Sequence, residues 1–305
     1  MFDLIIVGAG PAGLAAALYA TRKRLKYLVL SVDLGGKSNN RMELPDMDDD
    51  HIIRARELVT VYRSRLEYLR SAYKLEPVTG ITAIDEGFRV TAGGNEEEAR
   101  AVVVATGTRI RKLDVPGEEE YRSKGLGYSS ISYSHIFDGK KVFLAGDSSR
   151  VLSSALELSI HAREVTVALM DGGNYDEQLV EFVSGLDRVT VIPSAQIKEF
   201  RGGDYAREVV VNGSGDTHLI QADGFFLEPT PMPNTEFLSE LIELTPTGHI
   251  PVDSRNMTVK PGLFAAGDVT GNGFEQILVA LGEGAKAGLS AYRYLLDTGN
   301  QLVNR

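Results

Sequence analysis

Residues 2–13 read FDLIIVGAGPAG, and the prediction of the fold starts with them. Residues 2–7 are a nearly continuous apolar run closed by glycine, which is typical of a buried strand in a parallel sheet. Residues 14–20 (LAAALYA) favour a helix, and residues 27–30 (YLVL) indicate a second strand. Strand, Gly-x-Gly-x-x-Gly, helix and strand in this order predict a dinucleotide-binding βαβ unit.

The motif residues have separate roles in such a unit. Gly8 allows the tight turn, Gly10 lets the backbone approach a pyrophosphate, and Gly13 lets helix and strand pack closely. Pro11 and Ala12 complete the motif, and the N-terminus of the following helix faces the diphosphate. A glycine-rich turn with a purely structural role is the minority interpretation in this context.

The end of the second strand departs from the motif. Asp or Glu is expected there to hold the ribose hydroxyls, but this sequence has Ser31, with Asp33 following it in the same loop. Ser31 could make a weaker, neutral hydrogen bond to the ribose. It could equally be a plain strand end, and both interpretations stay open.

Composition narrows the class of protein. At 305 residues the chain has room for two domains, and 43% hydrophobic with 24% charged residues is typical of an ordinary soluble globular protein. The net charge of −10 disfavours nucleic-acid binding, which needs clustered Lys and Arg. Residues 4–7 are too short for a membrane span and lack a signal peptide's basic region and cleavage site. We therefore expect a cytoplasmic protein with no nucleic-acid or membrane partner.

Residue types for thiol and metal chemistry are missing or scattered. The sequence contains no cysteine, which excludes disulfides, thiolate catalysis and thiolate metal sites. Its histidines are His51, His135, His161, His218 and His249. No two of them stand at ligand spacing, so we assign no metal ligand.

Residues 50–107 are predicted to form one helix followed by several strands. A helix is expected from about residue 50 to 72, because apolar residues recur at helical spacing and the aspartates at 48–50 favour a helix N-terminus. Strand-like runs follow near residues 78–83, 88–91 and 99–105. The last run leads into Thr106 and Gly107.

A second distinctive segment lies near the C-terminus. Residues 261–269 (PGLFAAGDV) predict a strand that runs into Gly267 and Asp268, and residues 284–296 predict a helix. An Asp just past the carboxyl end of a strand lies where open α/β sheets bind ligands. Taken alone, Asp268 could equally be a helix-cap or turn residue.

Five motifs together resemble a known family. They are residues 8–13, 35–36, 105–107, 115–118 and 264–268. In sequence and order they resemble the FAD-binding framework of the low-molecular-weight thioredoxin reductases, over nearly the whole chain. The resemblance implies an α/β fold with two Rossmann-like dinucleotide-binding domains, the second inserted in the first. It places a discontinuous FAD-binding domain at 1–114 and 243–305 and a nucleotide-binding domain at 115–242.

The resemblance also implies FAD as the cofactor and a homodimer as the assembly. The first glycine motif would hold the pyrophosphate, Asp268 the ribityl chain, and the stretch of Gln276 and Ile277 would lie at the flavin ring. The candidate cofactor-binding residues are Gly8, Gly10, Pro11, Ala12, Gly13, Ser31, Gly36, Lys37, Thr106, Gly107, Gly267, Asp268, Glu275, Gln276 and Ile277. No catalytic residue is assigned.

The redox-active Cys-x-x-Cys-Asp segment of that family has no counterpart here. Its cysteines match Ser129 and Ser132, and its acid matches Tyr133. A serine hydroxyl cannot form a disulfide or accept electrons from a flavin, and no His-Asp pattern indicates an activated nucleophile. We therefore expect a loop without dithiol chemistry.

The inserted domain also departs from the family's nucleotide motif. Residues 146–151 read GDSSRV, so only Gly146 remains of Gly-x-Gly-x-x-Ala. Ser148 adds a side chain, and Asp147 a negative charge, where a pyrophosphate approaches. The family's cationic cluster for the 2′-phosphate of NADPH is matched by LMD, which ends in Asp171. An acid there repels that phosphate but could accept bonds from a ribose hydroxyl, so NADPH use is doubtful and NADH use stays open.

Three functional hypotheses remain. The first, which we favour, is an FAD enzyme that passes electrons between its flavin and a non-thiol partner, either a small molecule or a protein such as a ferredoxin. The second is an NADH-dependent flavin, ferredoxin or quinone reductase, or an oxidase. The third is a non-catalytic FAD-binding scaffold. The inserted domain could also hold another nucleotide or a second flavin.

Overall fold

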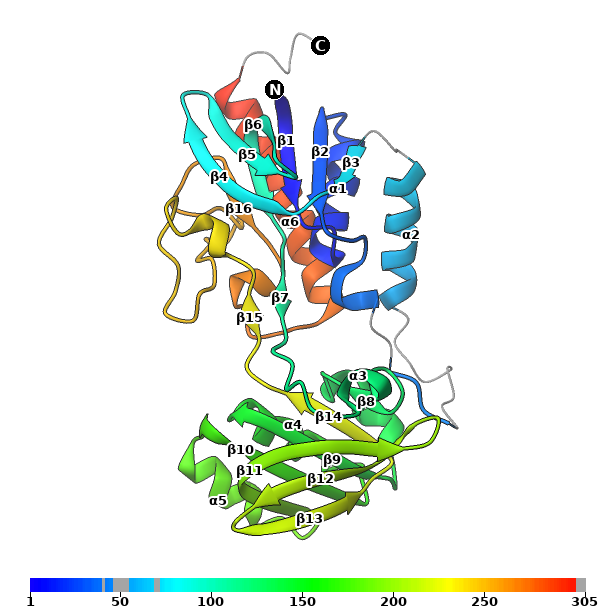
Figure 1. Cartoon of the computed structure of the whole chain (residues 1–305). Coiled ribbons are helices and arrows are strands. Elements are labelled where there is room, and N and C mark those ends of the chain that lie inside the picture. Colours follow the sequence, from blue (N-terminus) through cyan, green and yellow to red (C-terminus); the bar gives the residue numbers. More distant parts are fainter. Residues whose placement is uncertain (40–41, 46–54, 69–71, 300–305) are drawn as a thin grey trace. The chain divides into compact units, whose positions relative to one another are not determined.

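The computed structural model describes residues 1–39, 42–45, 55–68 and 72–299. The chain divides into two compact units (Figure 1). Unit 1 comprises residues 1–39, 53–109 and 232–305, and unit 2 comprises residues 40–52 and 110–231. The sequence predicted domain boundaries between residues 114 and 115 and between residues 242 and 243. In the structure, the chain passes from unit 1 to unit 2 between residues 109 and 110 and returns between residues 231 and 232.

Unit 1 is built on a seven-stranded sheet in the order β3-β2-β1-β6-β5-β4, with β16 also paired to β6. Its strands are β1 (Phe2–Val7), β2 (Tyr27–Ser31), β3 (Tyr73–Leu75), β4 (Val78–Ile84), β5 (Gly87–Ala92), β6 (Asn95–Val104) and β16 (Leu263–Ala265), and a separate pair is formed by β7 (Thr108–Arg109) and β15 (Met232–Pro233). β1 is parallel to both β2 and β6, and β16 is parallel to β6. The carboxyl ends of these four strands therefore form one edge of the sheet.

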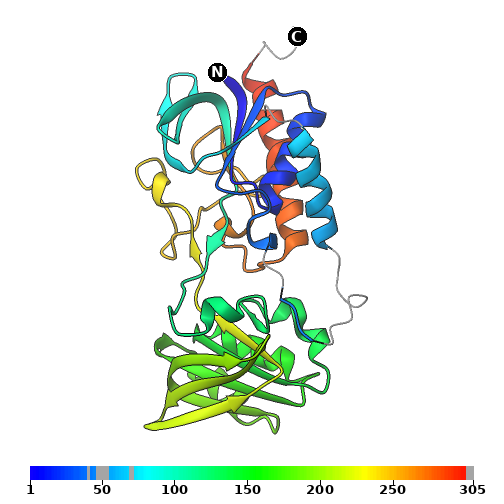
Figure 2. The same cartoon turned by 45° about the vertical axis from the view of Figure 1, so that its right-hand side comes forward.

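Three helices pack on one face of this sheet, side by side in Figures 1 and 2. They are α1 (Pro11–Arg22), α2 (Ala55–Tyr68) and α6 (Ile277–Thr298). Successive side chains of β1 point to opposite faces, so Leu4 and Ile6 pack beneath the helices. Ile5 and Val7 pack into a second core on the other face. Burial on both faces of the sheet requires a strand that is apolar throughout, as residues 4–7 are.

Glycines set the close approach of α1 to the sheet and of α6 to α1. A Cβ on Gly13 would lie 1.9 Å from the Gly8 carbonyl oxygen. A Cβ on Gly284 would lie 2.0 Å from the Ala12 carbonyl oxygen. Since neither position has room for a side chain, these two contacts fix how closely α1 approaches the end of β1 and how closely α6 packs on α1.

Unit 2 is a second α/β unit with a seven-stranded sheet in the order β13-β12-β11-β10-β9-β14-β8. Its strands are β8 (Leu126–Gly127), β9 (Lys141–Ser148), β10 (Glu164–Asn174), β11 (Val189–Gly202), β12 (Ala206–Gly213), β13 (Asp216–Gln221) and β14 (Gly224–Glu228), and its helices are α3 (Glu118–Tyr121), α4 (Arg150–Leu158) and α5 (Glu177–Ser184). β8 to β11 and β14 run parallel, while β12 and β13 are antiparallel additions. The predicted α/β fold with two Rossmann-like units is confirmed.

The helix predicted for residues 50–72 contains α2 (Ala55–Tyr68). The aspartates at 48–50 and residues 51–54 and 69–71 lie outside the described residues. The C-terminal helix begins at Ile277 rather than at residue 284. Gly282 and Gly284 lower the intrinsic helix propensity of this segment, but packing of α6 against α1 outweighs that preference.

The close packing of α6 predicts opposite effects for two substitutions on that helix. Gly284→Ala should destabilise the protein by about 1–3 kcal/mol, because the methyl group would overlap the Ala12 carbonyl oxygen. Gly282→Ala is the matched control, since its Cβ would meet no atom within 4 Å. It should stabilise by up to about 1 kcal/mol, because Ala favours a helix over Gly. Thermal unfolding measures both, and equal midpoints would contradict the packing described.

Candidate functional site

The carboxyl edge of unit 1 carries the glycine turn between β1 and α1. Gly8 has a φ of +100°, and a Cβ there would lie 2.3 Å from the Ala105 carbonyl oxygen, so the turn needs glycine. Gly10 is the opposite case, because a Cβ there would meet no atom within 4 Å. No side chain caps the N-terminus of α1 at Gly10. Open space beside uncapped helical N–H groups fits the pyrophosphate of a dinucleotide.

The loop after β2 lies directly on this turn. The Ser31 hydroxyl oxygen accepts a hydrogen bond from the Ala9 N–H at 3.0 Å. The Gly35 N–H donates to the Ala9 carbonyl oxygen at 2.8 Å, and a Cβ on Gly36 would lie 3.2 Å from the Gly10 Cα. Ser31 therefore shapes the turn. Its hydroxyl can still donate a hydrogen bond, so its contact with a ribose stays a prediction.

Lys37, in the short 3₁₀ helix η1 (Gly36–Asn39), meets three side-chain oxygens at the same edge. Its Nζ lies 2.6 Å from Asp268 Oδ2, 2.8 Å from Thr108 Oγ1 and 3.1 Å from Glu275 Oε1. The Thr108 hydroxyl donates to the same Glu275 oxygen at 2.9 Å. The structure thus brings together three residues that were predicted for one site. Thr108 was missed, although it follows directly after Gly107.

Thr106 and Gly107 are held in place by Asn234. The Asn234 Nδ2 donates to the Thr106 carbonyl oxygen at 2.9 Å, and the Thr106 hydroxyl donates to the Asn234 carbonyl oxygen at 2.7 Å. The Asn234 N–H donates to the Gly107 carbonyl oxygen at 3.1 Å. Asn234 fixes the end of β6 from a distant point of the sequence, and no local motif marked it.

Gly267 and Asp268 follow β16 and lie beside the start of α1. A Cβ on Gly267, whose φ is +79°, would lie 3.0 Å from the Ala12 Cβ. Glu283 of α6 accepts hydrogen bonds from the Gly267 N–H at 2.7 Å and from the Asn272 Nδ2 at 2.9 Å. Glu283 therefore anchors the loop that presents Asp268. Sequence reasoning missed it, because one acid on an amphipathic helix resembles a solvated residue.

The remaining predicted residues of the site are at the N-termini of helices. Pro11 and Ala12 open α1, while Gln276 is the N-cap residue of α6 and Ile277 its first residue. His249 was not predicted, and its ring lies within 3 Å of where a Cβ on the neighbouring Gly271 would stand. Burial lowers the pKa of His249, and the charges of two nearby carboxylates, Glu275 and Asp268, oppose that shift.

In unit 2, side chains form hydrogen bonds with one another and with the backbone across the carboxyl ends of the parallel strands. β9 and β14 are neighbours where the strand order reverses, and Gly146 pairs with Glu228 at their ends. Asp147 Oδ1 accepts from the Thr230 N–H at 2.6 Å and from the Thr230 hydroxyl at 2.8 Å. Its Oδ2 lies 3.2 Å from Arg111 Nη2. These bonds span the crevice in which a doubly wound sheet binds its ligand.

Tyr175, which follows β10, occupies the adjoining part of this edge. Its hydroxyl lies 2.7 Å from the Gly146 carbonyl oxygen and 2.9 Å from the Met170 carbonyl oxygen. Burial, and after it the charge of Asp147, raises the pKa of Tyr175 to about 12, so the hydroxyl stays a donor at neutral pH. A tyrosine thus lies against the glycine that remains from the nucleotide motif, whereas Gly10 of unit 1 faces open space.

The structure brings the predicted serine pair together. Ser129 Oγ and Ser132 Oγ are 3.3 Å apart, and Ser132 is the second residue of the 3₁₀ helix η4 (Ile131–Phe137). Ser130 between them is buried and donates its N–H and its hydroxyl to Glu228 Oε1, at 2.8 Å and 2.7 Å. The Ser154 hydroxyl donates to Glu228 Oε2 at 2.6 Å. Among the described residues, no base bonds to Ser129 or Ser132, so neither hydroxyl is activated.

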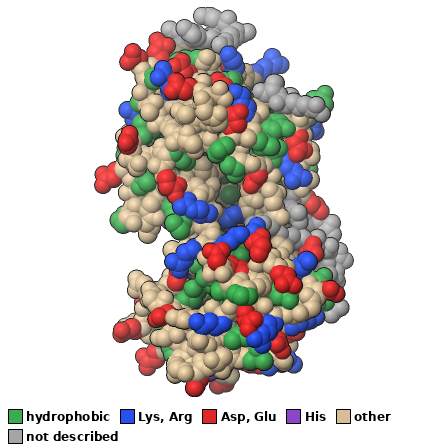
Figure 3. All heavy atoms as spheres, in the orientation of Figure 1, with side chains coloured by type: hydrophobic (Ala, Val, Ile, Leu, Met, Phe, Trp, Pro, Cys, Tyr) green, Lys and Arg blue, Asp and Glu red, His purple; other side chains and the backbone are tan. Residues whose placement is uncertain are grey.

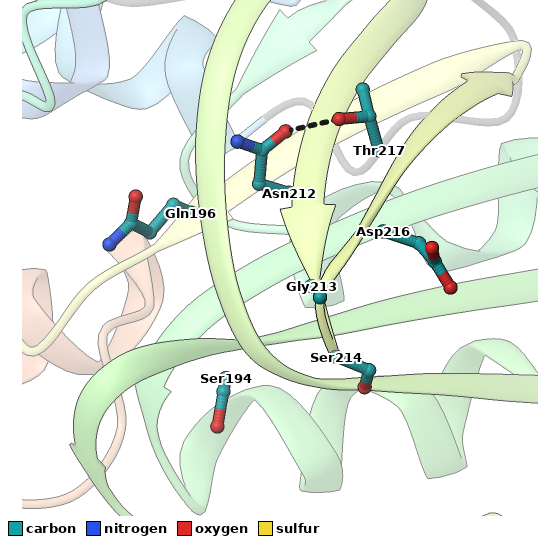
Figure 4. Close-up of a pocket in the computed structure, with 8 residues that line it drawn as sticks. Ser194, Gln196, Asn212, Gly213, Ser214, Asp216 and Thr217 are labelled. Carbon is teal, nitrogen blue, oxygen red and sulfur yellow. Dashed lines mark hydrogen bonds between the residues drawn. The ribbon is translucent and has the colours of Figure 1, made fainter.

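A hollow at the antiparallel end of unit 2 is lined mostly by residues with polar side chains and by glycines (Figure 4). Its lining includes Ser194, Gln196, Asn212, Asp216 and Thr217. The Thr217 hydroxyl donates to Asn212 Oδ1 at 2.9 Å, as the dashed line shows. No residue of a predicted motif lines this hollow, so we assign it no function.

On the face shown in Figure 3, basic and acidic side chains are interspersed. Within the ranges that the structure describes, no cluster of three His, Cys, Asp or Glu side chains is arranged to hold a metal. The same ranges contain no helix with the length and apolar character of a membrane span.

Comparison with known sequences places these features in a family. The family model of the pyridine nucleotide-disulphide oxidoreductases matches residues 2–284. The F component of alkyl hydroperoxide reductase from Pseudomonas aeruginosa is 36% identical, over 97% of this chain and 59% of that protein. A protein named NADH dehydrogenase from Ferdinandcohnia aciditolerans is 31% identical, over 97% of this chain and 58% of that protein. The chain therefore spans less than two thirds of the length of these relatives.

Solved structures agree with the fold. Thioredoxin reductase from Streptococcus pyogenes superposes with a TM-score of 0.87 at 30% identity, covering 97% of this chain and 99% of that one. Thioredoxin reductase from Giardia duodenalis gives a TM-score of 0.85 at 26% identity, covering 97% and 99%. The resemblance to thioredoxin reductases is thus confirmed, in a sequence without cysteine. This chain is a member of the pyridine nucleotide-disulphide oxidoreductase family.

Proposed function

We propose that the protein is an FAD-dependent oxidoreductase that passes electrons between its flavin and a non-thiol partner. FAD is the cofactor of the family, and the edge of unit 1 fits it. When bound, FAD supplies the ring that accepts and donates electrons. The chain's own residues bind and orient it: the turn at Gly10 holds the pyrophosphate, Asp268 holds the ribityl chain, and Gln276 lies at the ring.

The observation that carries this proposal is that the dinucleotide edge of unit 1 is kept while every thiol is gone. Gly10 faces open space at an uncapped helix N-terminus. Ser129 and Ser132 stand together where the family has its cysteines, but hydroxyls cannot cycle between dithiol and disulfide. The electrons of the flavin must therefore go to, or come from, an acceptor or donor outside this pair.

The side chains at the carboxyl edge of the unit 2 sheet argue against NADPH as the electron donor. A pyrophosphate there would have to displace the bonds from Asp147 to Thr230 and the Tyr175 hydroxyl from the Gly146 carbonyl. Asp171 is exposed at the position where a 2′-phosphate would need a cation. Binding would leave polar groups of the protein unpaired and add like charges, so its free energy is unfavourable on both counts.

The alternative that a specific observation favours is an NADH-dependent reductase or oxidase. One relative is named NADH dehydrogenase, and Asp171 could accept a hydrogen bond from a ribose hydroxyl that NADPH lacks. In this alternative the side chains of Asp147 and Tyr175 would have to rearrange when NADH binds. A cytoplasmic homodimer is part of both proposals; it rests on the resemblance, and size-exclusion chromatography with light scattering measures the assembly.

The first prediction from this proposal concerns flavin binding. Gly10→Glu should abolish FAD binding with little effect on folding, because the new side chain enters open space and places a carboxylate where the pyrophosphate lies. Gly203→Glu, where a Cβ also meets no atom within 4 Å, is the matched control and should keep its flavin. Absorbance at the flavin bands per mole of purified protein measures the outcome. Equal flavin content in the two variants would refute the assignment.

A second prediction concerns the electron donor. NADPH should reduce the bound flavin far more slowly than dithionite does, because losing cationic partners and gaining acids weakens binding by about a thousandfold. NADH should rank above NADPH, since it lacks the 2′-phosphate. Anaerobic stopped-flow mixing at matched concentrations follows the bleaching of the flavin. Fast, saturable reduction by NADPH with a micromolar constant would contradict the proposal.

A further inference from the structure

Lys37 is held by oxygens from three other segments of unit 1. They belong to Thr108 after β6, to Asp268 after β16 and to Glu275 just before α6, at the distances given above. An ammonium group has three N–H donors, so these oxygens use its full capacity. One cation thus faces two carboxylates at the edge of the sheet.

The strand order places this group on the flavin half of the cofactor. In a dinucleotide-binding unit, the ribose beside the adenine lies at the end of the second strand, which here is β2. The pyrophosphate lies at Gly10, after β1. Since β6 and β16 lie on the other side of β1, the second half of the dinucleotide extends toward their ends. Thr108 and Asp268 follow those two strands.

The group lies close enough to the cofactor path for its charge to act on it. The backbone beside Lys37 is in contact with the glycine turn, because a Cβ on Gly36 would be 3.2 Å from the Gly10 Cα. The side chains are partly buried, with 35% of Lys37, 12% of Asp268 and 21% of Glu275 exposed. Charges in such a setting are screened by solvent less than exposed ones.

We propose that Lys37 raises the reduction potential of the flavin and that Glu275 lowers it. The inference rests on the proposed binding of FAD in unit 1. When the flavin takes two electrons from a reductant and a proton from solvent, one negative charge is added to it. A cation beside the ring stabilises that charge, and a carboxylate destabilises it. Asp268 and Glu275 therefore offset Lys37, and the balance of these charges contributes to the potential.

The test measures the reduction potential of the bound FAD in purified holoprotein against a reference dye under anaerobic conditions. Lys37→Met should shift the potential to more negative values, by about tenfold in the equilibrium with the dye or about 30 mV for two electrons. Glu275→Gln keeps the shape of the side chain and should shift the potential in the opposite direction. Lys37→Arg retains the charge and should stay near the parent protein.

Lys74→Met is the matched control, because Lys74 forms an ion pair with Glu97 at the same 2.6 Å distance within unit 1. It should leave the potential unchanged. If Lys37→Met purifies without flavin, the upward shift of Glu275→Gln alone decides. Unchanged potentials, or shifts of the same sign for Lys37→Met and Glu275→Gln, overturn the inference while leaving FAD binding intact. A parent protein without FAD would instead overturn the proposed function.

Discussion

The backbone of α1 touches the backbone at the end of β1, and this close contact determines where the site of unit 1 forms. A Cβ on Gly13 would lie 1.9 Å from the Gly8 carbonyl oxygen, and a Cβ on Gly8 would lie 2.3 Å from the Ala105 carbonyl oxygen. The turn can therefore lie against both α1 and the end of β6 only because these two positions lack side chains. Gly284 allows α6 to lie equally close to α1. This packing brings residues 267 and 268 beside Ala12 and turns the helix N-terminus toward open space at Gly10. The proposed cofactor site is therefore a consequence of how the core of unit 1 packs.

The two units show what happens when the same topology keeps or loses those small residues. In unit 1, the edge where the strand order reverses is open at Gly10 and lined by polar groups of opposite charge. In unit 2, Asp147 and Tyr175 bond across the equivalent edge and meet the hydrogen-bonding needs of the strand ends. Glu228, with its three hydrogen bonds from Ser130 and Ser154, ties the serine turn to α4 and β14. The side chains of Asp147 and Tyr175 satisfy the edge of unit 2 internally, which is the basis for the proposal that NADPH is not the electron donor.

The sequence alone was sufficient to predict those elements whose structure depends on neighbouring residues. The apolar run at residues 2–7, the three glycines and the alanine-rich segment after them predict β1, the turn and α1. Each of these elements depends on residues that are close together in sequence. The resemblance assigned Lys37, Asp268 and Glu275 to one site, and the structure joins them. Thr108, Asn234 and Glu283 were missed because their roles come from partners far away in sequence. Tyr175 was missed for the same reason, since a tyrosine after a strand carries no signal until the strand order is known.

The proposed function requires a single flavin, held by unit 1, as the redox group of this chain. Reductive titration of the anaerobic holoprotein with dithionite, combined with quantification of the released FAD, counts the electrons and the flavins per chain. We expect one FAD per chain and uptake of two electrons per chain, because the sequence contains no cysteine and side chains of unit 2 bond across its own edge. Two flavins per chain, or uptake of four electrons, would show that unit 2 carries a second redox group, and the proposal of a single flavin would be wrong.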